Sequence, residues 1–361
     1  VYSVIMKHYV TKRRAIFLLA VSIYIFGYLQ SIAPGTIAST LMDDIHLSAS
    51  ELGLISSIYF LFYALIQLPL AFVVDRFAPR KILLGFYFVT VLGSLLFVYA
   101  DNFTLALISR SLLGIGTGGL FIPALKLIGE YYSPEEATKT SAIFMGLGCI
   151  GGTFFATVPL LYLENIIGWR STLFYYSLIG VFVMILAVFI FRSREQKEAS
   201  TQKAQTSVSV NASEFYKLLF NRNFLLIQLL FFISIGVYIS FQGLWAAQYF
   251  AETVKVSSGL ISAMIMCLPL GYFIGSLAAP YISEKIYQSK VIAIQLGLFL
   301  LFVGWVSMTF LSSSFSAIIV SAFIFLTGFA TGIICPLIFS AINDNVPPNL
   351  IGFSLGITNF S

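Results

Sequence analysis

Long apolar runs and short polar segments alternate along the whole chain. A helix of about 20 apolar residues, rising about 1.5 Å per residue, crosses the hydrocarbon core of a bilayer, which is about 30 Å thick. A membrane barrel would instead show alternating segments of about ten residues. Because hydrocarbon offers backbone groups no hydrogen-bond partner, the runs predict helices. Ten full spans and the beginning of an eleventh are expected, at Ala15–Ala38, Leu52–Val74, Ile82–Ala100, Phe103–Gly129, Ser141–Leu163, Ser171–Phe191, Phe224–Phe250, Gly259–Ser283, Val291–Leu311, Phe315–Ile342 and from Leu350 onward.

Composition agrees with this pattern. The chain is 59% hydrophobic and 10% charged, whereas soluble domains carry about 25% charged residues. The cysteines, Cys149, Cys267 and Cys335, all lie in apolar runs and are interpreted as core residues, not as a disulfide or metal site. The sequence contains no glycine-rich nucleotide-binding loop and no metal-ligand cluster. We therefore expect an all-α integral membrane protein without enzyme activity, cofactor or metal, which is monomeric and does not bind nucleic acid.

The basic residues predict the orientation in the membrane. With the N-terminus in the cytoplasm, sixteen Lys and Arg residues fall in cytoplasmic segments, and only Arg170 and Lys255 fall in outer loops. Cytoplasmic loops of membrane proteins carry such an excess of basic residues. The sequence predicts a multi-pass protein of a bacterial inner membrane.

A polar stretch divides the spans into two groups. We expect an N-terminal six-helix bundle at 1–191, a cytoplasmic linker at 192–222 and an incomplete C-terminal bundle at 223–361, interrupted within the eleventh span. The segment "SEFYKLLFNRN" before span seven is either a short interfacial helix or the first turn of that span. The segment Pro280–Lys290 repeats the arrangement of Ala71–Lys81 at an offset of 209 residues. Such duplication is typical of transporters whose halves rock about a central site.

The turn between spans two and three is densely charged. It contains Asp75, Arg76, Arg80 and Lys81 in "DRFAPRK", and we name Asp75–Lys81 the charged turn. It resembles the signature loop of the major facilitator superfamily, although alanines stand at 71 and 78 where the family carries glycines. The resemblance implies a gate in which Asp75 faces the N-terminus of span eleven, where an acid is favoured by the helix dipole. Alternatively, these basic residues only set the topology.

Span four contains an arginine inside the apolar run. Arg110 is followed by glycines in "RSLLGIGTGG", which resembles the span-four pattern of the same superfamily. A charge at mid-membrane costs about 2.5–3.5 kcal/mol on insertion scales. Arg110 therefore either faces a cavity that binds substrate or extends to the outer surface. Span five, with "GLGCIGGTFFATVP", resembles the Gly- and Pro-rich motif of the family, in which helices pack closely.

Polar and aromatic side chains in spans one, two and seven are candidates for the lining of a cavity. They are Tyr24, Tyr28, Gln30, Tyr59, Tyr63, Tyr238, Gln242 and Trp245. Polar groups prefer the interior of a bundle to lipid, but a tyrosine can equally lie beside lipid headgroups at the membrane surface. The tract "SFQGLWAAQYF" resembles span seven of bacterial organic-solute permeases.

The charges within the spans limit the class of solute. No Asp or Glu lies in the middle of any span, while Arg110 is positive. This favours an anionic or neutral solute and disfavours large cations. The resemblance therefore implies a secondary transporter of a small organic solute, of the amino acid or organic acid class, working by alternating access. A multidrug or metabolite exporter and a transporter-fold solute sensor remain alternatives.

Overall fold

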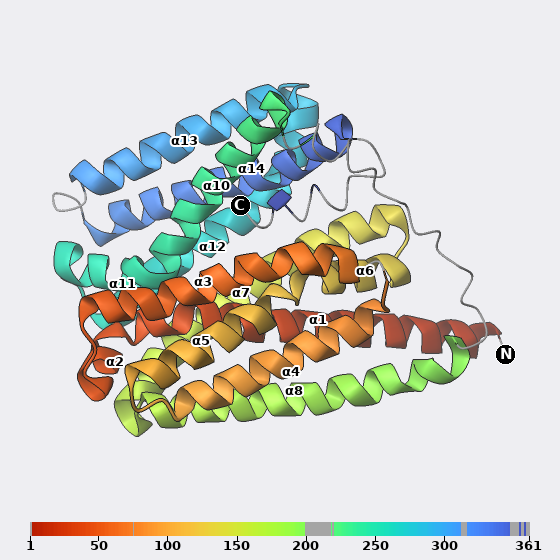
Figure 1. Cartoon of the computed structure of the whole chain (residues 1–361). Helices are drawn as coiled ribbons and strands as arrows, with labels where there is room; N and C mark the ends of the chain where they lie inside the picture. Colours follow the sequence, from red (N-terminus) through yellow and green to blue (C-terminus); the bar gives the residue numbers. More distant parts are fainter. Residues whose placement is uncertain are drawn as a thin grey trace. The chain divides into compact units, whose positions relative to one another are not determined.

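The computed structural model describes residues 2–74, 76–198, 218, 220–311, 316–346, 354, 357 and 358. Helices connected by short turns make up this part of the chain (Figure 1), which confirms the predicted all-α class. The α-helices are α1 (Tyr2–Thr36), α2 (Ala38–Ile45), α3 (Ala49–Val73), α4 (Pro79–Val98), α5 (Phe103–Gly118), α6 (Phe121–Tyr131), α7 (Pro134–Ile167), α8 (Trp169–Glu198), α10 (Arg222–Ser240), α11 (Ala246–Tyr249), α12 (Ser258–Tyr281), α13 (Lys290–Leu311) and α14 (Ala317–Asn345). Three π-helical turns follow or interrupt them, η1 (Phe241–Trp245), η2 (Phe250–Val254) and η3 (Ile282–Ile286).

Ten helical stretches in the described residues are long and apolar enough to cross a membrane. This confirms the ten full spans expected from the sequence, and the chain is an integral multi-pass membrane protein. The start of the predicted eleventh span lies outside the described residues, as does most of the predicted linker. The helix α8 continues to Glu198, so the first residues of that linker are helical.

The chain forms two compact units. The first comprises the described residues within Val1–Ser31, Ser39–Gly152 and Leu163–Ser207. The second comprises those within Ile32–Ala38, Thr153–Tyr162 and Val208–Ser361. Within the second unit, Gln242 Nε2 donates a hydrogen bond to Thr153 Oγ1 at 2.8 Å.

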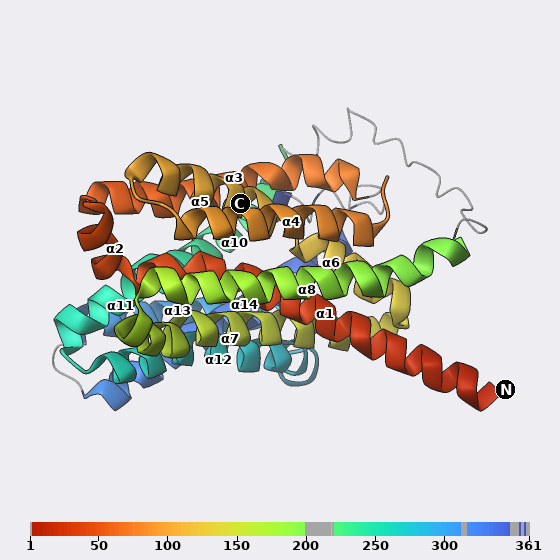
Figure 2. The ribbon, with the colours of Figure 1, turned by 90° about the horizontal axis from the view of Figure 1, so that it is seen from below.

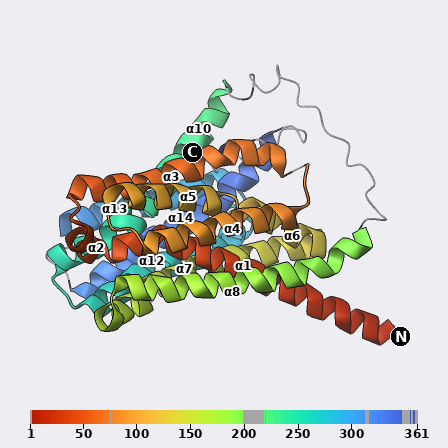
Figure 3. The same ribbon diagram turned by 60° about the horizontal axis from the view of Figure 1, so that its bottom comes forward.

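In the first unit, α5 packs between α3 and α4 (Figure 3). The helix α8 runs alongside α4 (Figure 2), and the Tyr87 hydroxyl on α4 donates to Gly180 O of α8 at 3.2 Å. The buried core of this unit includes Ile23, Tyr87, Leu120 and Phe144.

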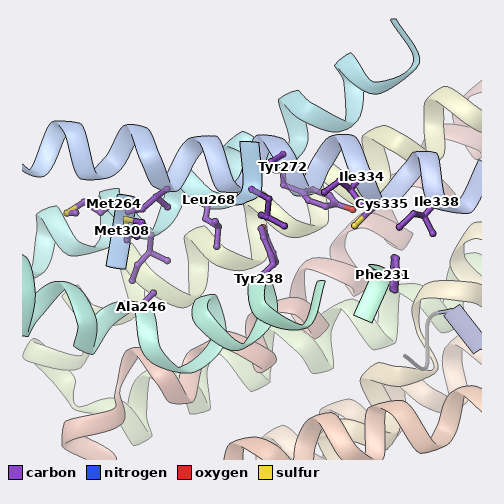
Figure 4. Close-up of a cluster of buried hydrophobic side chains, with 14 of the residues drawn as sticks. Phe231, Tyr238, Ala246, Met264, Leu268, Tyr272, Met308, Ile334, Cys335 and Ile338 are labelled. Atoms are coloured by element: carbon purple, nitrogen blue, oxygen red, sulfur yellow. The ribbon is translucent and has the colours of Figure 1, made fainter. Parts of the chain in front are cut away.

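In the second unit, α14 packs against α12, α13 and α10. The buried side chains between these helices include Phe231, Tyr238, Leu268 and Tyr272 (Figure 4).

Glycines bring the helices together in a pattern that repeats between the units. A Cβ on Gly114 would lie 2.2 Å from Tyr59 O, and a Cβ on Gly328 would lie 2.0 Å from Leu268 O. One turn further on, Gly118 and Gly332 meet the backbones of Tyr63 and Tyr272 in the same way. The α12 partners follow the α3 partners by 209 residues, and the α14 glycines follow the α5 glycines by 214. The duplication seen in the sequence therefore extends to the contacts between backbones.

The fourth span is broken, whereas its counterpart is continuous. The helix α5 ends at Gly118 and α6 begins at Phe121, but α14 runs unbroken from Ala317 to Asn345. Pro123 cannot donate a backbone hydrogen bond to the preceding turn, but a proline alone does not explain the break, because α14 contains Pro336 and is continuous. At the break, Gln67 Nε2 of α3 donates to Gly118 O at 2.9 Å. A side chain from a neighbouring helix thus satisfies the carbonyl at the end of α5.

Candidate functional site

Arg110 lies deep inside the first unit. Asn102 caps α5, with its side chain accepting from the Leu105 backbone N–H, and Arg110 projects from the second turn after the cap. Only 1% of the residue is exposed. The side chain thus does not reach the surface, and burial of a cation in this way requires polar partners.

Backbone carbonyls and an aromatic ring provide the observed partners of Arg110. Nη1 donates to Gln30 O of α1 at 2.6 Å, and Nε points at Ile55 O of α3, 3.5 Å away. The guanidinium lies over the Tyr59 ring, 4.3 Å from its centroid, a geometry in which the ring attracts the cation. Nη2 is buried and has no hydrogen-bond partner among the described residues. The two N–H groups of Nη2 are therefore free to bind a further acceptor.

The two predicted tyrosines of α3 extend from this arginine along one helix face. Tyr59 is buried, and its hydroxyl is hydrogen bonded to Thr117 Oγ1 at 2.8 Å. Tyr63 is partly exposed and stacks on Tyr59 with a centroid distance of 6.4 Å. The sequence analysis did not predict a role for Thr117. Its equivalent in the internal repeat is Thr331, at the same offset of 214 residues that relates the glycines of α5 and α14.

Gln30 contacts Arg110 through its backbone, and its side chain points elsewhere. Gln30 Nε2 donates to Ser94 Oγ of α4 at 2.9 Å, and Ser94 Oγ is 2.7 Å from Ser177 Oγ of α8. All three residues are buried. The sequence predicted a cavity-lining amide, whereas the structure shows Gln30 in a hydrogen-bonded chain across three helices. Ser94 and Ser177 were not predicted, because single serines in apolar runs are too common to stand out.

Tyr24 and Tyr28 pack against the glycine-rich face of α7. A Cβ on Gly148 would lie 2.0 Å from the Tyr24 ring, and a Cβ on Gly152 would lie 2.6 Å from Tyr28 Cβ. Tyr24 also stacks on Phe144 at 4.8 Å. The glycines of span five therefore make room for the aromatic side chains of α1, as close helix packing requires.

The three candidates of span seven belong to the second unit. Tyr238 and Gln242 are buried, and Tyr238 lies 5.6 Å from the Tyr272 ring. Trp245 is 57% exposed and lines a groove of about 870 Å³ together with Trp305 of α13. Trp245 therefore lies on a different face of the span from Gln242. The sequence of this tract alone does not show that difference.

The charged turn is described except for Asp75, which lies outside the described residues. Arg76 and Lys81 are exposed, while Arg80 is buried at the first turn of α4. The amides of Arg76 and Phe77 both donate to Val73 O at 3.1 Å. The turn is therefore tight, as the short spacing between the two spans predicted.

The structure thus brings Arg110, Tyr59, Tyr63 and the Gln30 backbone together. Across the described residues, no group of three His, Cys, Asp or Glu side chains could hold a metal ion. The chemistry of the cluster is that of a buried cation and hydroxyl groups, which can recognise an anion or a hydroxylated solute.

The family model described as "Major Facilitator Superfamily" matches residues 17–361. The chain belongs to the Major Facilitator Superfamily. Its fold is similar to the solved inward-facing, unoccupied structure of a bacterial homolog of the human lysosomal transporter Spinster, with a TM-score of 0.72 and 18% identity, covering 97% of this chain and 80% of that one.

Two curated relatives of this superfamily member are similar in sequence. The nitrite extrusion protein of Bacillus subtilis is 23% identical over 267 residues, covering 70% of this chain and 63% of the relative. The probable L-galactonate transporter of Escherichia coli is 28% identical over 192 residues, covering 52% of this chain and 42% of the relative. The chain thus spans less than two thirds of the length of these two relatives.

Proposed function

We propose that this superfamily member transports a small organic anion, of the organic acid or amino acid class, across a bacterial inner membrane by alternating access. Arg110 is the observation that carries the proposal. The buried guanidinium contacts two backbone carbonyls and the Tyr59 ring; within the described part of the chain it pairs with no acid, and its Nη2 has no hydrogen-bond partner. A carboxylate would supply both the charge and the missing acceptor.

The internal repeat supports a functional role for this charge. The position equivalent to Arg110 in α14 is Ile324, which is also buried. The same glycine contacts follow both residues, four and eight positions further along the helix, so the packing of the helices does not require an arginine. A costly charge that packing does not need is typical of a residue retained for function.

The names of the relatives agree with an anionic solute. Nitrite and L-galactonate are both anions at neutral pH, and both relatives are named for the movement of their solute. One name refers to extrusion, so the proposal does not specify a direction. Membership of a superfamily of transporters supports transport as the activity.

The other candidate residues receive roles under the same proposal. Tyr59 and Tyr63 orient the solute beside Arg110. Tyr24, Tyr28 and Gln30 fix the position of α1 next to this site. Tyr238, Gln242 and Trp245, in the second unit, are candidates for the lining of a cavity there. The charged turn, with Asp75, Arg76, Arg80 and Lys81, controls access from the cytoplasm.

The test compares ligands and variants on the complete purified protein. We expect L-galactonate or nitrite to raise the melting temperature, and the neutral lactone of L-galactonate to have no effect. Arg110→Ile, which installs the residue of the other half, should weaken binding about 30-fold or more, because removing one partner of a buried charged pair costs about 2–5 kcal/mol. Arg110→Lys should retain part of the affinity, since it keeps the charge but not the fork of donors.

Lys285→Met is the control, because it removes an exposed cation from the second unit. Stabilisation by lipophilic cations or by the neutral lactone alone would contradict an anionic solute. Unchanged anion affinity in Arg110→Ile would remove Arg110 from the binding site.

A further inference from the structure

Lys126 is a charged residue of span four for which the proposed function has no role. It lies on α6, the segment beyond the break, and is partly buried. Its Nζ donates to Val74 O of α3 at 2.6 Å. Val74 is the residue that ends α3, directly before the charged turn.

The last carbonyls of a helix have no partner within the helix and must find one elsewhere. At the end of α3, Val73 O accepts from the amides of Arg76 and Phe77, and Val74 O accepts from Lys126. A cation is also favoured beside the partial negative charge at a helix C-terminus. Lys126 therefore completes the C-terminal cap of α3 from a different span.

A second contact on the same face of α6 supports this one. Ile122, four residues before Lys126, packs against the buried cluster of Leu70, Val74 and Ile82. Residues four apart lie on one side of a helix. This face of α6 thus packs against a cluster that joins the end of α3, which carries Val74, to the start of α4, which carries Ile82.

The described residues of the other half of the repeat lack this arrangement. Val74 and Lys126 correspond to Ser283 and Ser340, and the span equivalent to α3 continues through the π-helical turn η3. The break between α5 and α6 also occurs only in the first half. A separate helical segment and a lysine cap therefore occur together, at the turn that carries Arg76, Arg80 and Lys81.

We propose that Lys126 is the positioning residue of the charged turn, and that α6 connects this turn to the span carrying Arg110. The idea that the turn controls cytoplasmic access rests on the proposed function. The positioning itself does not, because it concerns only how firmly the turn is held against α6. A displacement of α5 on solute binding would reach the turn through the α5–α6 break and the Lys126–Val74 bond.

The test measures how often the turn leaves α6. A cysteine at Val74, where the native side chain is 7% exposed, reacts with a maleimide only when the turn opens. In the complete purified protein without solute, Lys126→Met should accelerate labelling of Val74→Cys about tenfold, the change in population that 1.4 kcal/mol produces. Lys126→Arg, which keeps a charged donor, should restore slow labelling.

Two controls separate positioning from general loosening. The native Cys149 on α7 is buried, and its labelling rate should not change in Lys126→Met. Arg14→Met removes an exposed cation from α1 and should leave both rates unchanged. Where Lys126→Met does not fold, Lys126→Gln provides the neutral variant.

The proposal would be overturned if Val74→Cys were labelled at the same rate with a neutral residue at position 126 as with Lys126. It would also be overturned if the labelling of Cys149 were accelerated equally. Addition of L-galactonate or nitrite then tests the link to transport. A solute-dependent labelling rate that Lys126→Met abolishes supports coupling from Arg110 to the turn. If neither solute binds, the proposed solute class fails while the solute-free rates still decide the role of Lys126.

Discussion

Arg13 and Glu136 form an ion pair between α1 and the start of α7. Arg13 Nη1 lies 2.9 Å from Glu136 Oε2, and the guanidinium lies over the Tyr132 ring, 4.4 Å from its centroid. Glu136 also completes a capping box with Ser133, in which side chains and backbone amides satisfy each other. One carboxylate thus serves both the helix start and the contact with α1.

These partners favour the ionised form of Glu136. Its pKa is lowered from the usual 4.5, first by the Ser133 backbone N–H and then by the Arg13 side chain. Because the pKa of Glu136 is lower in the folded than in the unfolded protein, its ionised form stabilises the fold. This contribution is complete above pH 4.5 and is lost as the pH falls through the lower pKa of the folded state. Wild type should therefore melt above Glu136→Gln at pH 7, and the difference should shrink on acidification below 4.5.

Thermal unfolding between pH 3 and 7 measures this difference (roughly the range of a carboxyl titration). Arg13→Gln should reproduce part of the loss, while Arg14→Gln, at the exposed neighbouring arginine, should not. A gap between wild type and Glu136→Gln that stays constant down to the lowest pH would assign the effect to packing.

The sequence could predict that Arg110 needs polar surroundings, because hydrocarbon does not solvate a charge. It could not identify the partners, since Gln30 O and Ile55 O are backbone atoms 80 and 55 residues away. For the same reason the sequence does not show that the side chain of Gln30 is hydrogen bonded to Ser94. Residue types reveal which groups need a partner, and only the packing of helices decides which partner they find.

At the scale of helices, the two units use the same crossing. The α5 glycines face the α3 backbone, and the α14 glycines face the α12 backbone. In a bilayer no hydrophobic force drives helices together. Small residues that let two backbones approach closely therefore stabilise their association. The equivalence makes the two halves controls for one another.

We expect Gly114→Ala and Gly328→Ala to destabilise the protein by similar amounts, about 1–3 kcal/mol each, the cost of overpacking a tight contact. The added Cβ would meet carbonyl oxygens of a neighbouring helix backbone at 2.2 and 2.0 Å, and a backbone cannot rotate away. Gly129→Ala and Gly236→Ala, where the new Cβ would have no described atom within 4 Å, are the matched controls. They should be neutral or gain up to about 1 kcal/mol from helix propensity.

Denaturant or thermal unfolding in detergent would rank the four variants. Equal effects at Gly114 and Gly129 would show that the crossing tolerates a methyl group. A large effect at only one of Gly114 and Gly328 would show that the repeat is not energetically equivalent.

Span positions followed from hydrophobicity, but interruptions within spans did not. The predicted fourth span, Phe103–Gly129, is two helices, and the predicted seventh, Phe224–Phe250, contains η1 and α11. A break at Gly118 depends on the side chain of Gln67, which supplies the hydrogen bond that a regular helix would have made. A local sequence window does not contain such a partner, so it predicts an uninterrupted helix.

At the scale of the whole molecule, the contacts at the two ends of the first unit agree with the charge pattern. At one end, Asp44 of α2 pairs with Arg170 and accepts from Trp169 Nε1, and Arg170 Nη2 donates to Ala100 O at 2.7 Å. Three loops that the sequence assigns to the outside therefore meet. At the other end, Lys126 reaches Val74 O, and Arg13 pairs with Glu136.

This arrangement predicts one orientation, with the basic end and the N-terminus in the cytoplasm, because positively charged segments are retained there. Two exposed aromatic residues report on the two ends, Phe77 in the charged turn and Tyr99 at the end of α4, which are 58% and 64% exposed. In a variant whose native cysteines are replaced, a membrane-impermeant maleimide should label Tyr99→Cys in intact cells and Phe77→Cys only after permeabilisation. The reverse pattern would place the charged turn outside and remove its proposed cytoplasmic role. Labelling of both in intact cells would mean that the basic residues do not fix a single topology, although sixteen of them lie in segments assigned to one side.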